Sequence, residues 1–282
     1  MDVSKVKVLV FDLDGTVYED THHFDYQAAR LKDKLSVEKQ SLFQQDFDAV
    51  KRDEHPIKIG RIYDGINDLV LVQLDNIVQE AYKWNGHRLS NEEINKLYPK
   101  PIEINYDTML SIGDPWWIST SIAGHYGLNS KKCYEAFLET REYMMGPEFE
   151  MEPIVGFKEV LSDIHEHVKL VLLTNSPQPD SEAILTKIGL DRLFDLKIFN
   201  GEKPTRTLER FEHIKNEFGV EYKEIMSVGD NWINEIRPVQ PLGCGTIFID
   251  SHGVGNPSSA DFVFECMGDA IPILKKIKNP LD

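Results

Sequence analysis

Two aspartates, one residue apart, follow an apolar run near the start of the chain. The segment reads VKVLVFDLDGT, so Asp12 and Asp14 come directly after the run from Val6 to Phe11. Carboxylates at this spacing repel each other, and a bound cation or a shared proton makes the arrangement tolerable. Asp-Gly is a common turn pair, which accounts for Asp14 and Gly15 but not for Asp12. The pair is therefore predicted to belong to a functional site.

Three further segments place polar side chains where a predicted strand ends or a loop begins. Thr174 and Asn175 end the second predicted core strand, Lys203 follows the third, and Asp230 ends the fourth, with Glu235 five residues later. Taken singly, such residues are usually a cap, a solvated charge or a turn. Because the carboxyl ends of parallel strands share one edge of a sheet, we expect all of them to converge there.

The second half of the chain alternates between helical and strand-like patterns. Strands alternating with helices of about ten residues indicate parallel βαβ units. The apolar run at residues 6–11 must join the same sheet, because one buried strand is not stable alone. The expected helices span 157–165, 180–188, 208–218 and a last one ending near 277, and the expected strands span 168–173, 194–199, 225–228, 245–249 and 261–264.

A long insertion separates the first strand from the rest of the sheet. Between Tyr26 and Met145 the apolar residues mostly recur at helical spacing, as they do from Ile66 to Ala81. The predicted fold class is therefore α/β, a Rossmann-like parallel sheet core with an inserted, mostly helical cap domain. The predicted core comprises residues 1–20 and 150–282, and the predicted cap comprises residues 21–149.

Composition and charge limit the possible partners. The chain has 282 residues, of which 41% are hydrophobic and 28% charged, and its formal net charge of −16 argues against nucleic acid or an anionic membrane. No apolar run approaches the roughly 20 residues that span a bilayer. The start enters a strand directly, without a signal-peptide layout. Cys133, Cys244 and Cys266 are odd in number and widely spaced, which is typical of the cytoplasm rather than of a disulfide framework.

The four polar segments together resemble the four motifs of the haloacid dehalogenase (HAD) superfamily. They read FDLDGT, LLTNS, the lysine of GEKP, and SVGDNWINE, and the resemblance covers residues 5–20 and 152–282. The first and fourth motifs are highly specific, and the lysine motif is weak on its own. Most phosphatases of the superfamily have Asp where Glu235 stands. The insertion resembles the helical cap that follows the first motif in this superfamily, but it is longer than usual there.

The resemblance implies a catalytic role for the first pair of carboxylates. Asp12 would be the nucleophile that forms an aspartyl-phosphate. Asp14 would be the general acid for the leaving alcohol and then the base that activates water. This second carboxylate favours a phosphatase over a dehalogenase, whose chemistry does not need it. Asp12, a backbone carbonyl near Asp14, and Asp230 would hold Mg²⁺, which prefers hard oxygen ligands.

The remaining motif residues would bind phosphate or support the site. Thr174, together with N–H groups near Leu13 and Asn175, would hold the phosphoryl oxygens. Lys203 would offset the repulsion between an anionic nucleophile and an anionic substrate. Glu235 would orient Lys203 or a water on the metal rather than bind the metal directly.

The resemblance thus implies a Mg²⁺-dependent phosphatase that acts on a small soluble phosphate monoester. Nucleotides, phosphoglycolate and sugar phosphates are all compatible substrates. One alternative is a phosphomutase or phosphotransferase of the same superfamily, which would return the phosphoryl group to a sugar. Another is a catalytically silent regulatory protein with the same fold, which would be expected to lose a carboxylate or the lysine.

The insertion and a few isolated residues are further candidates for a lid or for the site. The insertion is expected to act as a mobile lid, with hinges at residues 15–21 and 146–156. For His22 and His23 a solvated linker is favoured over a place in the site. For Trp116 and Trp117 ordinary packing is favoured over a wall of the substrate site. His165 and His167, which have no partners at metal-ligand spacing, are interpreted as structural.

Overall fold

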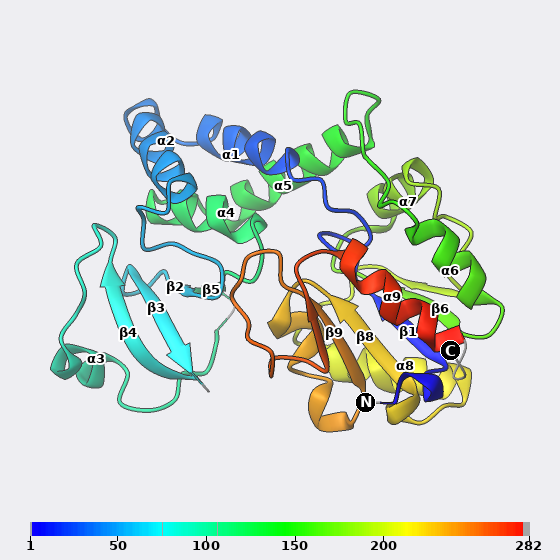
Figure 1. Cartoon of the computed structure of the whole chain (residues 1–282). Coiled ribbons are helices and arrows are strands. Elements are labelled where there is room, and N and C mark those ends of the chain that lie inside the picture. Colours follow the sequence, from blue (N-terminus) through cyan, green and yellow to red (C-terminus); the bar gives the residue numbers. More distant parts are fainter. Residues whose placement is uncertain (1, 75, 106, 279–282) are drawn as a thin grey trace. The chain divides into compact units, whose positions relative to one another are not determined.

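The computed structural model describes residues 2–74, 76–105 and 107–278 (Figure 1). The chain forms two compact units. Residues 1–20 and 143–282 make up the first, the core unit, and residues 21–142 make up the second, the inserted unit.

A six-stranded sheet forms the centre of the core unit. All its strand pairs are parallel. The first strand of the chain lies in the middle of the sheet and is buried along its whole length, as its continuous apolar sequence requires. The strand order is β10 (Phe262–Phe264), β9 (Gly245–Ile249), β8 (Ile225–Gly229), β1 (Val8–Phe11), β6 (Lys169–Leu173) and β7 (Leu196–Ile198).

Helices cover both faces of this sheet because successive residues of β1 point in opposite directions. Val8 and Val10 belong to a core cluster with Phe211 and Ile214 of α8 (Thr207–Phe218). On the other face, Phe11 makes an edge-to-face contact with Phe157 of α6 (Phe157–His165), and α6 packs against α9 (Met267–Lys278). The unit also contains α7 (Gln178–Lys187) and the short turns η1 (Val3–Lys5), η2 (Tyr222–Glu224), η3 (Trp232–Ile236) and η4 (Gln240–Leu242).

The inserted unit combines helices with a small antiparallel sheet. The sheet has the order β4 (Ile77–Lys83), β3 (Leu69–Leu74), β2 (Ile62–Asp64) and β5 (Met109–Ser111). One apolar cluster lies among the helices and another lies under the sheet. The helices are α1 (His23–Asp33), α2 (Val37–Lys51), α3 (Asn91–Leu97), α4 (Trp116–His125) and α5 (Ser130–Met145), and α5 continues into the core unit.

The predicted α/β class and the six core strands are confirmed, but the helical interpretation of residues 66–81 is wrong. Leu69 to Val72 form part of β3, and Ile77 to Ala81 form part of β4. A nearly continuous apolar run satisfies a helical template and a buried-strand template equally well. Ile66, which the helical pattern placed in the core, is 73% exposed.

None of the helices among the described residues combines the length and the apolar character that crossing a membrane requires.

Candidate active site

Three neighbouring strands bring the predicted polar residues to one edge of the core sheet. Asp12 follows β1, Thr174 follows β6 and Asp230 follows β8, and β1 pairs with both of the other strands. The ladder extends past the end of β1, since the Asp12 backbone N–H donates to the Val228 carbonyl at 3.0 Å. Asp12 is buried, and Asp230 is partly buried.

Lys203 connects two of the predicted carboxylates. Its Nζ lies 2.6 Å from Asp12 Oδ1 and 2.7 Å from Glu235 Oε1, and its side chain is 2% exposed. Asn175 holds the lysine backbone at both ends, since Asn175 Oδ1 accepts from the Lys203 N–H at 2.7 Å and Asn175 Nδ2 donates to the Lys203 carbonyl at 2.9 Å. Asn175 therefore positions Lys203 through its side chain, whereas the sequence predicted only a phosphate-binding role for Asn175.

Gly229 leaves the space that the Glu235 side chain needs to reach Lys203. A Cβ atom on Gly229 would lie 2.4 Å from Glu235 Cγ, so only glycine fits at the end of β8. The other carboxylate oxygen, Oε2, accepts the Asn231 N–H at 2.9 Å. The longer side chain of Glu235, compared with the usual Asp, thus spans from η3 to the lysine.

The cluster contains two buried carboxyl groups and one ammonium. Burial is the largest influence on both carboxylates and raises the pKa of Asp12 above its ordinary value and the pKa of Glu235 to about 8. Burial alone would lower the pKa of Lys203, but attraction to Asp12 and Glu235 outweighs it and raises that pKa. Because burial disfavours two ionised carboxylates beside a single ammonium, a bound cation would stabilise their ionised forms.

The donor atoms around this charge suit a magnesium ion. One carboxylate oxygen each from Asp12, Asp230 and Glu235 lies within 4.8 Å of the others, and no further such group occurs among residues 2–74, 76–105 and 107–278. Three hard oxygen ligands are typical of Mg²⁺ rather than of zinc or copper. Glu235, expected to act indirectly, thus lies within reach of a shared cation. The predicted contribution of an Asp14 carbonyl stays a prediction.

Gly15 allows Asp230 to approach the first motif. Its φ angle is +73°, and a Cβ atom there would lie 2.3 Å from Asp230 Oδ2. A side chain at position 15 would therefore be strained and would displace a candidate metal ligand.

Asp14 lies in a different set of contacts from Asp12. Ser176 Oγ donates to Asp14 Oδ2 at 2.7 Å, and the Tyr18 hydroxyl donates to Asp14 Oδ1. Thr174 Oγ1 in turn accepts the Ser176 N–H at 3.0 Å. Neither Tyr18 nor Ser176 was among the predicted site residues. Ser176 could have been found, because it lies inside the LLTNS motif, whereas nothing in the spacing marks Tyr18.

The weaker candidates fall into separate surroundings. His23 is 1% exposed and lies against Phe24 and Trp116, so the solvated-linker interpretation is wrong for His23, whereas His22 is exposed. Trp116 packs within the inserted unit, and Trp117 is 38% exposed. His165 Nε2 lies 3.1 Å from Asp195 Oδ2, an arrangement that fits a structural role.

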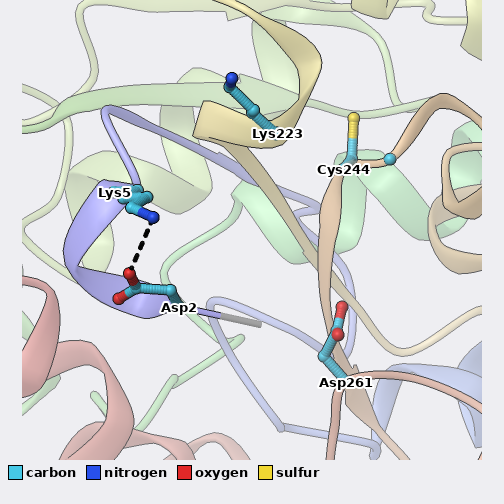
Figure 2. A pocket seen from close by; sticks show the side chains of 6 residues that line it. Asp2, Lys5, Lys223, Cys244 and Asp261 are labelled. Carbon is cyan, nitrogen blue, oxygen red and sulfur yellow. Dashed lines mark ion pairs between the residues drawn. The ribbon is translucent and has the colours of Figure 1, made fainter.

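A cavity of about 270 Å³ lies at the opposite edge of the core sheet (Figure 2). Two of its lining residues, Cys244 and Asp261, directly precede the amino ends of β9 and β10, whereas ligands of open α/β sheets bind at the carboxyl ends. Burial raises the pKa of the Cys244 thiol to about 12, so this thiol stays protonated and unreactive. The lining residues are Asp2, Lys5, Lys223, Gly243, Cys244 and Asp261.

The core unit is thus an α/β domain with a carboxylate–lysine cluster at the carboxyl edge of its parallel sheet. The family model of haloacid dehalogenase-like hydrolases matches residues 6–238, and the chain belongs to this family. No curated protein matches the chain.

Solved structures with a similar fold cover nearly the whole chain. One is described as a predicted phosphoglycolate phosphatase from Haemophilus somnus, with 15% identity, a TM-score of 0.50, and coverage of 95% of this chain and 98% of that one. The YfnB protein of Bacillus subtilis, bound to magnesium, has 12% identity, a TM-score of 0.51 and the same coverage. A HAD phosphatase from Thermococcus onnurineus has 17% identity and a TM-score of 0.50, again with the same coverage. At these identities the likeness shows the fold.

Proposed function

We propose that this hydrolase is a Mg²⁺-dependent phosphatase that acts on a small soluble phosphate monoester through an aspartyl-phosphate on Asp12. The observation that carries the proposal is the pair of carboxylates with separate partners. Asp12 contacts the ammonium of Lys203, as a nucleophile for an anionic substrate requires, and Asp14 accepts hydrogen bonds from the hydroxyl groups of Ser176 and Tyr18. A displacement of halide would not need the second carboxylate.

In the first step a carboxylate oxygen of Asp12 attacks phosphorus. The bond between phosphorus and the leaving oxygen breaks, and that oxygen takes the proton from Asp14. Lys203, which lies against Asp12, reduces the repulsion between the nucleophile and the phosphoryl oxygens. The products of this step are the free alcohol and an aspartyl-phosphate.

In the second step water attacks the phosphorus of the aspartyl-phosphate. Asp14, now ionised, takes a proton from that water, and the bond between phosphorus and the Asp12 oxygen breaks. Inorganic phosphate leaves and Asp12 is restored. The same carboxyl group therefore gives a proton in one step and recovers it in the next.

The remaining motif residues would bind phosphate or metal. Thr174, Asn175 and Lys203 would bind the phosphoryl oxygens, with Asn175 also fixing the lysine backbone. Asp12 and Asp230, with Glu235 in reach, would hold Mg²⁺, which supplies positive charge against the phosphoryl group when bound. The magnesium in the similar YfnB structure supports this choice of metal.

We assign substrate selection to the inserted unit, acting as a cap. The core residues named above would contact only the phosphate and the metal, so other residues must bind the remainder of the substrate. The charge of −16 and the three scattered cysteines support a cytoplasmic phosphatase. The two connections at residues 15–21 and 146–156 would be the hinges of the cap.

The test is an activity panel with the purified full chain. With Mg²⁺ present, the protein should release inorganic phosphate from p-nitrophenyl phosphate, acetyl phosphate and some nucleotide, sugar phosphate or phosphoglycolate substrates, and EDTA should abolish the release. The panel also contains a 2-haloacid, which would reveal halide release, and a sugar phosphate whose isomer can be measured separately, which would reveal a phosphomutase. Halide release or isomerised sugar without inorganic phosphate would replace the proposal, and inactivity on every ester would reject it.

A further inference from the structure

Both carboxylate oxygens of Asp14 accept a hydroxyl hydrogen bond, and the two donors come from different segments of the core unit. Tyr18 lies in the loop that follows β1 and donates to Oδ1. Ser176 lies in the loop that follows β6 and donates to Oδ2 at 2.7 Å. Two donors on opposite oxygens restrict rotation of the carboxyl plane more than one donor could.

Each donor is itself fixed in place. Tyr18 is 0% exposed, and the turn before it closes through a hydrogen bond from the Val17 N–H to the Leu13 carbonyl at 3.1 Å. The backbone of Tyr18 forms a parallel bridge with that of Asp14, which returns the tyrosine to the side of the aspartate. The hydroxyl therefore reaches Asp14 from a rigid position.

Ser176 is held by its backbone on both sides. Its N–H donates to Thr174 Oγ1 at 3.0 Å, and its carbonyl accepts the Asn200 N–H at 3.1 Å. Ser176 is 5% exposed. It thus links Thr174, the proposed phosphate-binding residue, to Asp14.

We propose that Tyr18 and Ser176 are positioning residues that aim Asp14 at the leaving oxygen in the first step and at the attacking water in the second. This inference rests on the proposed phosphatase function. A proton transfer requires the donor and acceptor atoms to lie within hydrogen-bond reach, so a freely rotating carboxyl group would be a poor acid and a poor base. Neither hydroxyl gives up its own proton in this scheme.

The two steps depend on Asp14 in different ways, so the positioning role of Tyr18 and Ser176 can be measured by comparing two esters. An alkoxide leaves only with a proton, whereas p-nitrophenolate is stable and leaves without one. The value of kcat/KM reports events up to release of the alcohol, so a misaimed Asp14 lowers it for an alkyl ester and spares it for p-nitrophenyl phosphate. Attack by water on the aspartyl-phosphate needs Asp14 whatever the ester was.

The experiment compares Tyr18→Phe and Ser176→Ala with the wild type in Mg²⁺. The probes are glycerol 2-phosphate and p-nitrophenyl phosphate. For each variant, kcat/KM for glycerol 2-phosphate should fall about tenfold or more, because a misaligned acid transfers its proton less efficiently. For p-nitrophenyl phosphate, kcat/KM should stay within about twofold while kcat falls and a burst of p-nitrophenol precedes the steady state.

Two matched variants control for the loss of a hydroxyl elsewhere in the core unit. Tyr222→Phe alters η2, which precedes the amino end of β8, and Ser162→Ala removes a hydroxyl that bonds the Lys158 carbonyl within α6. Both should leave the two esters unaffected. The ratio of the two kcat/KM values is independent of how much of a variant is folded, so partial unfolding cannot imitate the expected result.

The outcomes separate this inference from the function beneath it. A wild type that hydrolyses neither ester would overturn the proposed function, and this inference with it. The positioning role alone would be overturned if the wild type is active but Tyr18→Phe and Ser176→Ala lower kcat/KM equally for both esters. The same holds if these variants lower kcat/KM for neither ester. A loss of kcat/KM confined to glycerol 2-phosphate, together with the burst of p-nitrophenol, would support it.

Discussion

The ammonium of Lys203 lies 2.6 Å from Asp12 Oδ1 where the two side chains are only 2% and 11% exposed. Charges interact more strongly in such a setting than in water, but each also loses its hydration. Each buried charge is therefore stabilised by its partner, and removal of one partner would leave the other charge buried and uncompensated. Because Glu235 contacts the same ammonium, removal of the lysine would leave two buried carboxylates facing each other.

Lys203→Met should reduce both activity and stability. Removing one partner of a buried ion pair costs about 3–5 kcal/mol of unfolding free energy. The loss should be larger at pH 8 than at pH 5.5, because at the lower pH the two carboxylates can take up protons instead. Urea unfolding at both pH values measures this, and phosphate release measures the activity.

Lys169→Met is the matched control for Lys203. Lys169 Nζ lies 2.8 Å from Asp195 Oδ1, but the lysine side chain is 54% exposed. An exposed pair contributes about 0–1 kcal/mol, so this variant should unfold nearly as the wild type does. Equal losses in the two variants would contradict the importance given to the buried pair.

Asp12→Asn and Asp14→Asn should fail at different points of the reaction. An amide is a poor nucleophile, so Asp12→Asn should abolish turnover and form no phosphorylated protein. Asp14→Asn should slow turnover by about 10²–10⁴-fold, the usual contribution of a general acid or base. With acetyl phosphate, which needs no acid to leave, Asp14→Asn should accumulate an aspartyl-phosphate detectable by intact mass. Near-normal rates in either variant would reject the assignment.

Gly15→Ala should weaken metal binding more than it weakens the fold. The new Cβ would lie 2.3 Å from Asp230 Oδ2, so the carboxylate must move. The φ angle of +73° adds about 1–2 kcal/mol of backbone strain for a non-glycine residue. Calorimetric titration with Mg²⁺ should show weaker affinity than for the wild type.

Gly219→Ala separates strain from displacement. Gly219 has a φ angle of +63° at the end of α8, and a Cβ there would meet nothing within 4 Å. This variant should lose a similar amount of stability and bind Mg²⁺ as the wild type does. Weakened Mg²⁺ binding by both variants would mean that strain alone accounts for the effect.

The strand ends could be predicted well from the sequence because each is marked by a few consecutive residues. An apolar run that stops at a polar residue shows where β1, β6 and β8 end, and parallel pairing then brings those ends together. Contacts between side chains have no such local mark, because they depend on how the backbone folds between the two residues. The contact from Tyr18 to Asp14 depends on how the turn after β1 closes.

The inserted unit was harder to predict for a related reason. In the run from Leu69 to Val72 every residue is apolar, so its period carries no information about helix or strand. Pairing of β3 with β4 and β2 decides the outcome, and that pairing is a non-local property. The packing of His23 against Trp116 joins residues 93 positions apart in the sequence and has no local signal either.

His55 should make stability depend on pH in the inserted unit. Burial lowers the pKa of His55 below its ordinary value of 6.5, although the charge of Asp46 opposes the shift. The unfolded chain therefore takes up a proton that the folded chain resists. The contribution of neutral His55 to stability is present above about pH 6.5 and is lost as the pH falls through its lowered pKa in the folded state.

The test replaces His55 by a residue that keeps its hydrogen bond but does not titrate. Nδ1 of His55 accepts the Ile57 N–H at 3.0 Å, and the side-chain oxygen of asparagine can accept a bond of this kind. The unfolding free energy of the wild type minus that of His55→Asn should fall between pH 7 and pH 5. A difference that does not change with pH would contradict the inferred pKa.

Trp116 and Trp117 are adjacent in the sequence, but their different exposure predicts different effects. Trp116 contacts the rings of His23, Phe24 and Phe137, so Trp116→Ala should lower the unfolding free energy by about 3 kcal/mol. Trp117 is 38% exposed, and Trp117→Ala should cost about 1 kcal/mol or less.

Trp117 is therefore the better test of the proposed cap. If the inserted unit reads the part of the ester beyond the phosphate, Trp117→Ala should raise KM for the best ester of the panel about tenfold, as expected when one large apolar contact is lost. KM for acetyl phosphate, which has almost nothing beyond the phosphoryl group, should stay unchanged. Urea unfolding provides the control, since a stability loss alone would lower the amount of active protein without changing either KM. Equal changes in KM for the two substrates would assign Trp117 to packing within the inserted unit rather than to substrate selection.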